Sequence, residues 1–205
     1  GSSDLGLTGM LVKRCVDIAL SSLVLLLLSP ILVVVALAVW LGSGSPILFR
    51  QQRVGLKFRR FHILKFRTMR IASGRSVTIA GDDRITRVGR FLRVTKLDEL
   101  PQFWNVLRGD MSLVGPRPEV PEYVDLFRER YRTVLTVRPG ITDLASIHFR
   151  NEEEVLSRSA DPLREYAERI LPAKLDLAEE YASMHTVFGD ICILFRTAIA
   201  IIRTH

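Results

Sequence analysis

The longest apolar segment of the chain is an uncharged run from Ile18 to Leu41, about as long as the ~20 residues that a membrane-spanning helix needs. Ser29-Pro30 lies at its middle, where proline removes a backbone donor and bends a helix. The run therefore predicts two half-helices of roughly a dozen residues, each ~18 Å long, and neither half alone would cross a hydrocarbon layer of ~30 Å. We expect the Ser29 hydroxyl to bond a carbonyl freed at the break.

Basic residues on both flanks of this run favour a segment that dips into the membrane and returns to the same side. Lys13 and Arg14 precede the run, and positive charge favours the cytoplasmic face. An ordinary kinked spanning helix is the alternative. A cleaved signal peptide fits less well, because the run is long and no small-x-small site follows it. The basic residues after the run are Arg50, Arg53, Lys57, Arg59 and Arg60.

A second amphipathic pattern lies near the C-terminus. Asp190, Arg196 and Arg203 fall on a different side of the predicted helix from its apolar residues. The segment is too short and too charged to span a membrane, so it predicts an interfacial helix, with burial against the protein's own core as the alternative. The apolar positions are Ile191, Leu194, Phe195, Ala198, Ile201 and Ile202.

The segments between these two patterns predict a mainly helical domain with little sheet. Apolar residues alternate with basic ones over residues 58–66, which is typical of a strand or an interfacial stretch, and Ile85–Val94 predicts a helix. Glu152-Glu153-Glu154 and Asp161-Pro162 resemble helix starts that lead into amphipathic helices around 163–181. Glycines at positions 74, 81 and 89 mark turns.

Charge and composition narrow the class of partner. The net charge of +7 predicts an anionic partner, and the surplus of Lys and Arg lies in residues 50–96. Nucleic acid is not favoured, since only 8% of residues are aromatic and no helix-turn-helix, RRM or zinc-finger signature is present. Acidic lipid head groups or a phosphorylated small molecule fit better. Cys15 and Cys192 suggest neither a disulfide framework nor a metal site, which fits a reducing compartment.

The adjacent carboxylates Asp98 and Glu99 are the main candidates for chemistry. They begin a predicted helix over residues 96–109, where the positive end of the helix dipole should keep Asp98 ionised. The apolar face of that helix should be Leu100, Phe103, Trp104 and Leu107, and Gly109 should end it. Such a carboxylate can bind Mg²⁺ or attack phosphorus, whereas an ordinary helix cap is the alternative interpretation.

Two proline-rich loops strengthen the chemical interpretation. Residues 114–119 (VGPRPE) and 138–142 (RPGIT) each hold an arginine beside prolines, at Arg117 and Arg138. A guanidinium on a restricted backbone suits bidentate binding of phosphate. Each loop alone is weak evidence, because arginine between prolines is common in turns.

These motifs, taken in order from about Lys13 to Thr142, resemble the bacterial sugar transferases, also called monotopic phosphoglycosyl transferases. The resemblance implies an α/β, mainly α fold with a re-entrant membrane helix and a compact catalytic domain on the cytoplasmic face of the bacterial inner membrane. It also implies Mg²⁺ and the short form of the family. The matching motifs are Ser29-Pro30, residues 81–86 (GDDRIT), 97–102 (LDELPQ), 109–118 (GDMSLVGPRP) and 138–142 (RPGIT).

The family resemblance further implies transfer of a sugar-1-phosphate from a nucleotide diphosphate sugar, with a lean to UDP-sugar, to polyprenyl (undecaprenyl) phosphate. Asp98 would be the nucleophile that displaces UMP and carries the phosphosugar, and Glu99 would assist at the metal or in proton transfer. Both would bind the metal. The residues that would bind donor phosphates are Arg93, Arg117, Lys65 and Arg150, and those that would support the site are Asp110 and Arg138.

The chain departs from the common family pattern after Thr142, so the segment that contains Arg150 leaves recognition of sugar and nucleotide open. Its histidine, His148, is expected to pack rather than catalyse. We expect a leader over residues 1–10, in which Gly1-Ser2-Ser3 resembles a cloning remnant, a membrane segment over 11–45, a catalytic domain over 46–150 and amphipathic helices over 151–205.

The sequence also bears on partners and on two alternative classes of protein. A homodimer stays open, and nucleic acid is not expected as a partner. A multi-spanning phosphotransferase would need more than one membrane segment. A non-enzymatic basic module that binds anionic lipid would tolerate loss of the Asp98 carboxylate.

Overall fold

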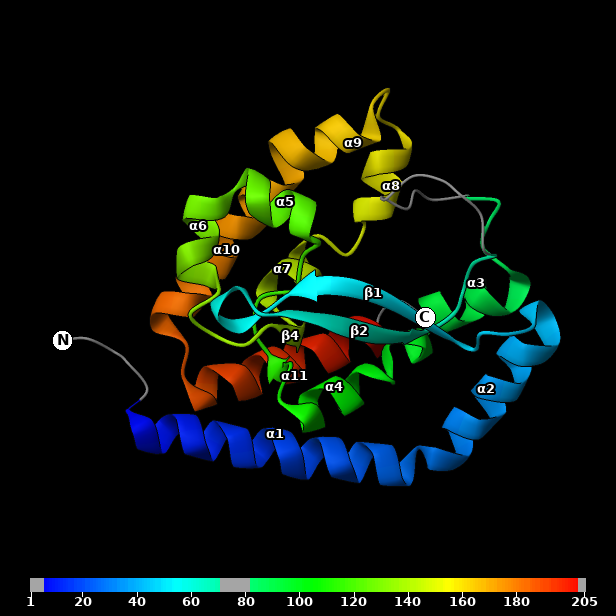
Figure 1. Cartoon of the computed structure of the whole chain (residues 1–205), viewed down its shortest axis with the longest axis horizontal. Helices are drawn as coiled ribbons and strands as arrows, with labels where there is room; N and C mark the ends of the chain where they lie inside the picture. The colour runs from blue at the N-terminus through cyan, green and yellow to red at the C-terminus, as the bar shows by residue number, and fades with distance from the viewer. Residues whose placement is uncertain (1–5, 71–81, 203–205) are drawn as a thin grey trace.

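The computed structural model describes residues 6–70 and 82–202, and their fold is mainly helical with two small sheets (Figure 1). The predicted turns at residues 74 and 81, the opening Gly1-Ser2-Ser3 and Arg203 lie outside the described residues. The strands are β1 (Leu48–Val54), β2 (Arg60–Phe66), β3 (Ser112–Val114) and β4 (Gly140–Thr142). The α-helices are α1 (Leu7–Leu27), α2 (Ser29–Ser43), α3 (Arg87–Val94), α4 (Gln102–Arg108), α5 (Pro121–Leu126), α6 (Arg128–Val134), α7 (Leu144–His148), α8 (Glu152–Ser157), α9 (Pro162–Glu165), α10 (Leu171–Met184) and α11 (Val187–Ile202). Short turns of other helix types are η1 (Leu56–Phe58), η2 (Leu97–Glu99) and η3 (Tyr166–Ile170).

The predicted break in the apolar run is confirmed. Helices α1 and α2 meet at Leu28 with a bend of 63°, and Pro30 lies in the first turn of α2. The Ser29 hydroxyl donates to the Leu26 carbonyl at 2.8 Å, as expected for a broken helix. Among the described residues, no single helix is long and apolar enough to cross a membrane.

The two helices are longer than the predicted dozen residues, since α1 has 21 residues and α2 has 15. Helix α1 begins at Leu7, inside the segment expected to be a leader, and continues through the charged positions that precede the apolar run. It therefore lies along the base of the domain before it reaches the break (Figure 1).

Charged residues dock the first half of α1 on the domain. Lys13 Nζ donates to the Val114 carbonyl of β3 at 3.0 Å and forms an ion pair with Asp190 of α11. Arg14 donates to two carbonyls at the end of α4, at 2.7 and 3.0 Å. Asp17, only 4% exposed, accepts a bond from a backbone N–H of β3 at 3.0 Å. In this structure Lys13 and Arg14 make tertiary contacts, a role that charge patterning alone did not indicate.

The far end of α2 is held to the same domain. Arg67, which follows β2 and is 6% exposed, donates to the carbonyls of Ser43, Gly44 and Ser45. Beneath this contact α2 buries apolar side chains against β2 and α3. The buried cluster consists of Val35, Val39, Phe66 and Leu92. Both ends of the broken helix thus contact one domain.

The two sheets are small and differ in direction. Strands β1 and β2 form an antiparallel hairpin, and β2 confirms the strand expected over residues 58–66. Strands β3 and β4 are parallel and place the two proline-rich loops side by side. Gly115 and Gly140 permit this approach, since a Cβ on Gly140 would lie 2.1 Å from the Gly115 nitrogen. Other residues at these positions would push the loops apart.

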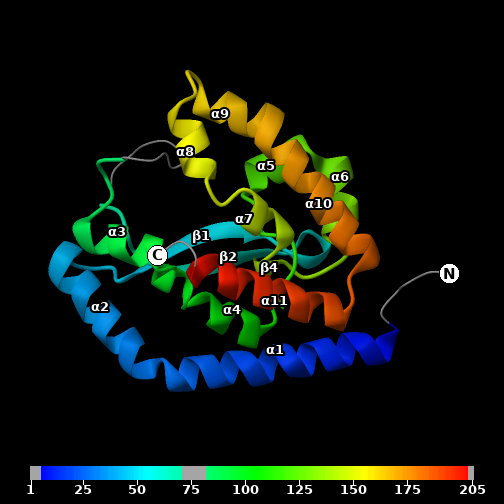
Figure 2. The same cartoon turned by 180° about the vertical axis from the view of Figure 1, so that it is seen from behind.

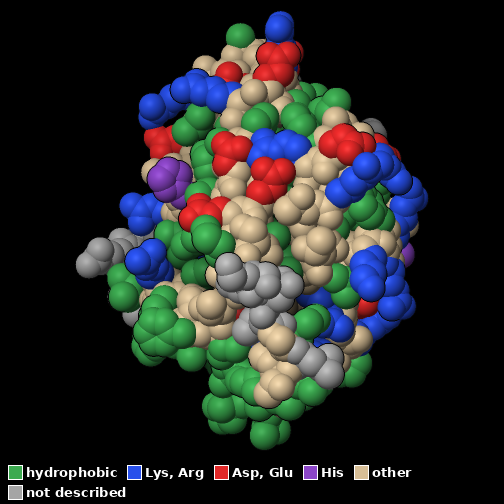
Figure 3. Space-filling model, turned by 90° about the vertical axis from the view of Figure 1, so that its left-hand side faces the viewer, with side chains coloured by type: hydrophobic (Ala, Val, Ile, Leu, Met, Phe, Trp, Pro, Cys, Tyr) green, Lys and Arg blue, Asp and Glu red, His purple; other side chains and the backbone are tan. Residues whose placement is uncertain are grey.

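Helix α11 has one face on the core and another that is exposed (Figure 2). Ile193 is buried, and Leu194 packs against the same cluster. The exposed apolar positions of α11 are Phe188, Ile191, Phe195 and Ile199. Hydrophobic side chains also gather along the lower edge of the molecule, where α1 lies (Figure 3). The predicted amphipathic helix is present, and one of its faces packs against the protein's own core, while the interfacial role of the exposed face stays a prediction.

We predict that Lys13→Met lowers the free energy of unfolding by about 3 kcal/mol, because the Asp190 carboxylate would stay buried without its cation. The measurement is chemical denaturation in detergent micelles. Lys13→Met combined with Asp190→Asn should recover part of the loss. Lys57→Met, at an exposed lysine, is the matched control and should change stability by less than about 0.5 kcal/mol. Equal losses in the two single-lysine variants would contradict the docking role.

Candidate active site

The carboxylate pair lies on the short turn η2 rather than on a continuous helix. The chain turns at Lys96 (φ 59°), forms η2 over Leu97–Glu99, and starts α4 only at Gln102. The prediction of one helix over residues 96–109 is therefore wrong over residues 96–101, although Gly109 (φ 84°) ends α4 as expected. The N-terminus of α4 does not lie at Asp98.

The buried face of α4 also differs from the predicted apolar face. Trp104 is 52% exposed, while Asn105 is fully buried. The Asn105 side chain donates to the His62 carbonyl at 2.8 Å and accepts from the Leu64 N–H at 3.0 Å. These bonds satisfy the free edge of β2 next to Lys65, which is why a polar residue faces inward here. Hydrophobic periodicity cannot detect such a contact.

Glu99 is held between two cations that come from distant parts of the chain. Lys65 Nζ on β2 lies 2.8 Å from Glu99 Oε1, and an Arg117 nitrogen lies 2.6 Å from the same oxygen. Burial alone would raise the pKa of Glu99, but Arg117 and Lys65 hold it well below the ordinary value. Burial lowers the pKa of Lys65, an effect that Glu99 partly offsets. Glu99 is therefore a fixed anion in this cluster.

Asp98 differs from its neighbour in having a carboxylate oxygen without a partner. It is 7% exposed, and Oδ1 is buried with no hydrogen bond among the described residues. Burial, and then repulsion by Glu99, raise the pKa of Asp98. This direction is opposite to the lowering that a helix dipole was expected to produce, because the N-terminus of α4 does not lie at Asp98. A poorly solvated carboxylate oxygen beside cations is suited to attack an electrophile or to bind a metal ion.

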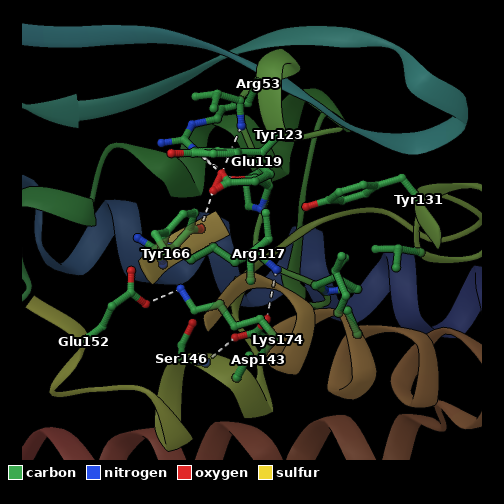
Figure 4. Close-up of a pocket in the computed structure, with 18 of the residues that line it drawn as sticks. Arg53, Arg117, Glu119, Tyr123, Tyr131, Asp143, Ser146, Glu152, Tyr166 and Lys174 are labelled. Atoms are coloured by element: carbon green, nitrogen blue, oxygen red, sulfur yellow. Dashed lines mark hydrogen bonds and ion pairs between the residues drawn. The ribbon is translucent and has the colours of Figure 1, made fainter. Parts of the chain in front are cut away.

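The loop of residues 115–118 brings Arg117 to the Asp98–Glu99 pair and is held in place by Asp143. The backbone N–H of Arg117 donates to Asp143 Oδ2 at 2.9 Å (Figure 4). The other oxygen of the same carboxylate, Oδ1, accepts from the Ser146 N–H at 2.7 Å and so caps α7. Pro116 and Pro118 are buried on either side. Glu99 raises the pKa of Arg117 further, so its charge is permanent.

The structure does not bring the other predicted site residues into direct contact with the carboxylate pair. Arg93 pairs with Glu153 of α8 and acts on Asp98 only through space, by lowering its pKa. Arg138 Nε donates to the Gly109 carbonyl at 3.0 Å, a loop contact. Asp110 lies 3.5 Å from Arg108. Arg150 is exposed beyond the end of α7 and forms no ion pair with another described residue.

The donor set around Asp98 is small for a metal site made by protein alone. Among the described residues, no group of three or more His, Cys, Asp or Glu side chains could hold a metal ion. Mg²⁺, however, usually binds through one or two carboxylates, keeps several waters and takes further oxygens from substrate phosphates. The unpartnered Oδ1 of Asp98 fits that mode. Glu99 could bind the metal only by giving up a contact with Lys65 or Arg117.

Asp143 and Asn105 are positioning residues that the sequence did not single out. Asp143 lies at the start of the segment after Thr142, whose role the sequence left open, and Asn105 lies in a helix described by its apolar positions. The sequence offered one signal for Asp143, a helix-capping pattern in which it lies three residues before Ser146.

A bent apolar helix pair is held on a basic domain, and a buried carboxylate lies beside cations from distant segments, an arrangement suited to binding phosphates. The chain belongs to the bacterial sugar transferase family, whose sequence profile it matches over residues 8–204.

Relatives with curated descriptions agree with this membership. A UDP-glucose:undecaprenyl-phosphate glucose-1-phosphate transferase of Escherichia coli (strain K12) is 40% identical over 194 residues, which cover 91% of this chain and 39% of the relative. One of Caulobacter vibrioides with the same description is 40% identical, over 94% of this chain and 70% of the relative. A UDP-N-acetylgalactosamine-undecaprenyl-phosphate N-acetylgalactosaminephosphotransferase of Aeromonas hydrophila is 44% identical, over 66% of this chain and 34% of the relative. The chain thus spans well under half the length of the first and the third.

We predict that Asp98 titrates above the ordinary value of 3.8 and that Glu99→Gln lowers its pKa. A raised pKa means that the carboxyl stays protonated to higher pH. Removing the Glu99 charge ends the repulsion and frees the positive charges of Lys65 and Arg117, and both effects favour the ionised form. Titration of ¹³C-labelled aspartate by NMR measures the midpoint, and Asp98→Asn identifies the signal.

The matched control for this titration is Glu122→Gln, at an exposed glutamate of α5, which should leave the midpoint of Asp98 unchanged. An upward shift in Glu99→Gln would contradict the described electrostatics.

Proposed function

We propose that this protein transfers a sugar-1-phosphate from a nucleotide diphosphate sugar, with UDP as the favoured nucleotide, to undecaprenyl phosphate. The observation that carries the proposal is the buried, unpartnered oxygen of Asp98 next to the Lys65–Glu99–Arg117 cluster. Membership of the sugar transferase family and the described activities of the relatives support it.

The proposed reaction has two displacements at phosphorus. The Asp98 carboxylate attacks the sugar-bearing phosphorus of the donor, and the bond to the leaving nucleotide breaks, so that UMP departs with the electron pair. The phosphate of the lipid acceptor then attacks the same phosphorus and frees Asp98. Arg117 would bind donor phosphate oxygens by exchanging contacts with Glu99. Lys65 would balance the negative charge of Glu99 while Arg117 contacts the donor.

Asp98 and Glu99 would hold Mg²⁺, which when bound supplies positive charge beside the phosphates of the donor. Arg93 would add long-range positive charge, since it lowers the pKa of Asp98 without touching it. Asp110, Arg138 and Arg150 would act through the loops that they border.

For location, we propose that α1 and α2 form a re-entrant segment in the bacterial inner membrane and that the domain lies on the cytoplasmic face. The support is geometric, because Lys13 and Arg67 fix opposite ends of the bent pair to one domain. Exposed apolar side chains around the break would meet lipid. They are Leu23, Leu26, Leu27, Ile31, Val33, Val34, Leu37, Trp40 and Leu41.

We predict that Asp98→Asn reduces release of UMP from UDP-sugars by about 1,000-fold or more, because the amide is a poor nucleophile. The assay contains Mg²⁺, undecaprenyl phosphate and the purified protein in detergent. In the absence of the lipid acceptor, the native protein should carry one phosphosugar on Asp98, detected by mass spectrometry, and a chelator should abolish its formation. Asp125→Asn, at an exposed aspartate, is the control. Retained turnover in Asp98→Asn would contradict the role of Asp98 as nucleophile, whereas no turnover in the native protein would favour a non-enzymatic lipid-binding role.

We further predict that the two ends of the helix pair lie on one side of the membrane. Thr8→Cys and Ser45→Cys, each in a background with Cys15→Ser and Cys192→Ser, should react with an impermeant maleimide from the same face of sealed vesicles. Labelling from opposite faces would restore the spanning-helix interpretation.

A further inference from the structure

A cavity of about 250 Å³ lies beside the Arg117 loop (Figure 4), and no residue of η2 lines it. Helices α6, α7 and α10 and the turn η3 contribute its walls. The cavity is smaller than the ~300–1,000 Å³ of pockets that take drug-sized ligands, so it suits one ring rather than a whole nucleotide sugar. Residues of the wall used below are Arg117, Glu119, Tyr131, Asp143, Ser146 and Tyr166.

Two hydroxyl groups on this wall have no partner in the described part of the chain. Ser146 Oγ is buried without a hydrogen bond, although its backbone N–H is used to cap α7. Tyr131 is 3% exposed, and no hydrogen bond joins its hydroxyl to another described residue. Buried polar groups are normally paired, so the unpaired Ser146 hydroxyl, with the Tyr131 side chain on the same wall, points to a ligand with hydroxyl groups.

The charged groups of the cavity are already paired with one another. Glu119 accepts from Arg53 at 2.9 Å and from the Tyr166 hydroxyl at 2.7 Å, and Asp143 is used by the Arg117 loop. Lys174 forms an ion pair with Glu152. A phosphate would gain little from Arg53 and Lys174, which carboxylates neutralise inside the cavity, so a neutral group fits this space better than the phosphate end of the donor.

The Tyr166 ring of the cavity does not provide a free stacking face for a nucleobase. Tyr166 is 6% exposed, its ring lies 5.1 Å from Lys174 Nζ, and it contacts the Tyr123 ring at 5.0 Å with a tilt of 57°. The ring is enclosed by the protein's own side chains. Hydroxyl readout therefore fits the cavity better than base stacking.

We propose that this cavity holds the sugar ring of the donor and that Tyr131 and Ser146 recognise its hydroxyl groups. Arg117 links the two sites, since its guanidinium contacts Glu99 while the residue also lines the cavity. This inference rests on the proposed function. It assigns sugar selectivity to α7, which follows Thr142, and to α6, and it leaves the nucleotide to another surface.

The test compares Tyr131→Phe and Ser146→Ala with the native protein on a panel of UDP-glucose, UDP-galactose, UDP-N-acetylglucosamine and UDP-N-acetylgalactosamine. Neither change removes a hydrogen bond between described residues, so both variants should stay folded. Each should lower kcat/KM for the preferred donor about tenfold and change the ranking of the sugars, because one hydrogen bond to a hydroxyl is lost. The inhibition constant of UMP should stay within about twofold of the native value, because UMP carries no sugar. Ser157→Ala, an exposed serine on α8, is the matched control.

The outcomes separate this inference from the function on which it rests. If UMP inhibition weakens about tenfold while the ranking of sugars is kept, the cavity binds the nucleotide and the inference is wrong. Unchanged kinetics in both variants would also overturn it and leave the proposed function standing. If the native protein releases UMP from no donor, both proposals fall.

Discussion

The buried ion pair between Lys13 and Asp190 is the contact on which the rest of the structure depends. It joins the first helix to the last, and the Tyr181 hydroxyl completes it by donating to Asp190 at 2.7 Å. Lys13 and Tyr181 both also contact the Val114 carbonyl at the end of β3, each at 3.0 Å. A charge buried this deeply is tolerated only when it is paired, so α1, β3, α10 and α11 must assemble together.

The two anchors of the broken helix lie next to the two cations of the candidate site. Val114, contacted by Lys13, comes three residues before Arg117, and Arg67, which holds the end of α2, comes two residues after Lys65. These segments are short and hydrogen-bonded, so a shift of either anchor would also shift the neighbouring cation of the site. The seating of the apolar helices on the domain and the geometry around Glu99 are therefore parts of one arrangement.

Local signals predicted the elements well. Ser29-Pro30 marked the break, alternation marked β2, and Asp161-Pro162 marked the start of α9, because each depends on a few neighbouring residues. The contacts of Lys13, Asp17 and Asn105 join positions 41 to 177 residues apart, and no local pattern specifies them. For the same reason the sequence predicted the identity of the Asp98–Glu99 pair but not its electrostatics, which depend on burial and on Lys65 and Arg117. The roles of Arg93, Asp110, Arg138 and Arg150 stay predictions.

The docking of α1 has a practical consequence for protein engineering. Deleting α1 and α2 would not yield a free-standing water-soluble domain, since Asp190 would lose its cation, a β3 N–H would lose its acceptor and part of the core would be uncovered. A soluble variant would have to keep the α1 backbone with Lys13, Arg14 and Asp17. Polar residues would replace only its outward positions, such as Leu23, Leu26 and Leu27, which contribute exposed apolar surface rather than docking contacts.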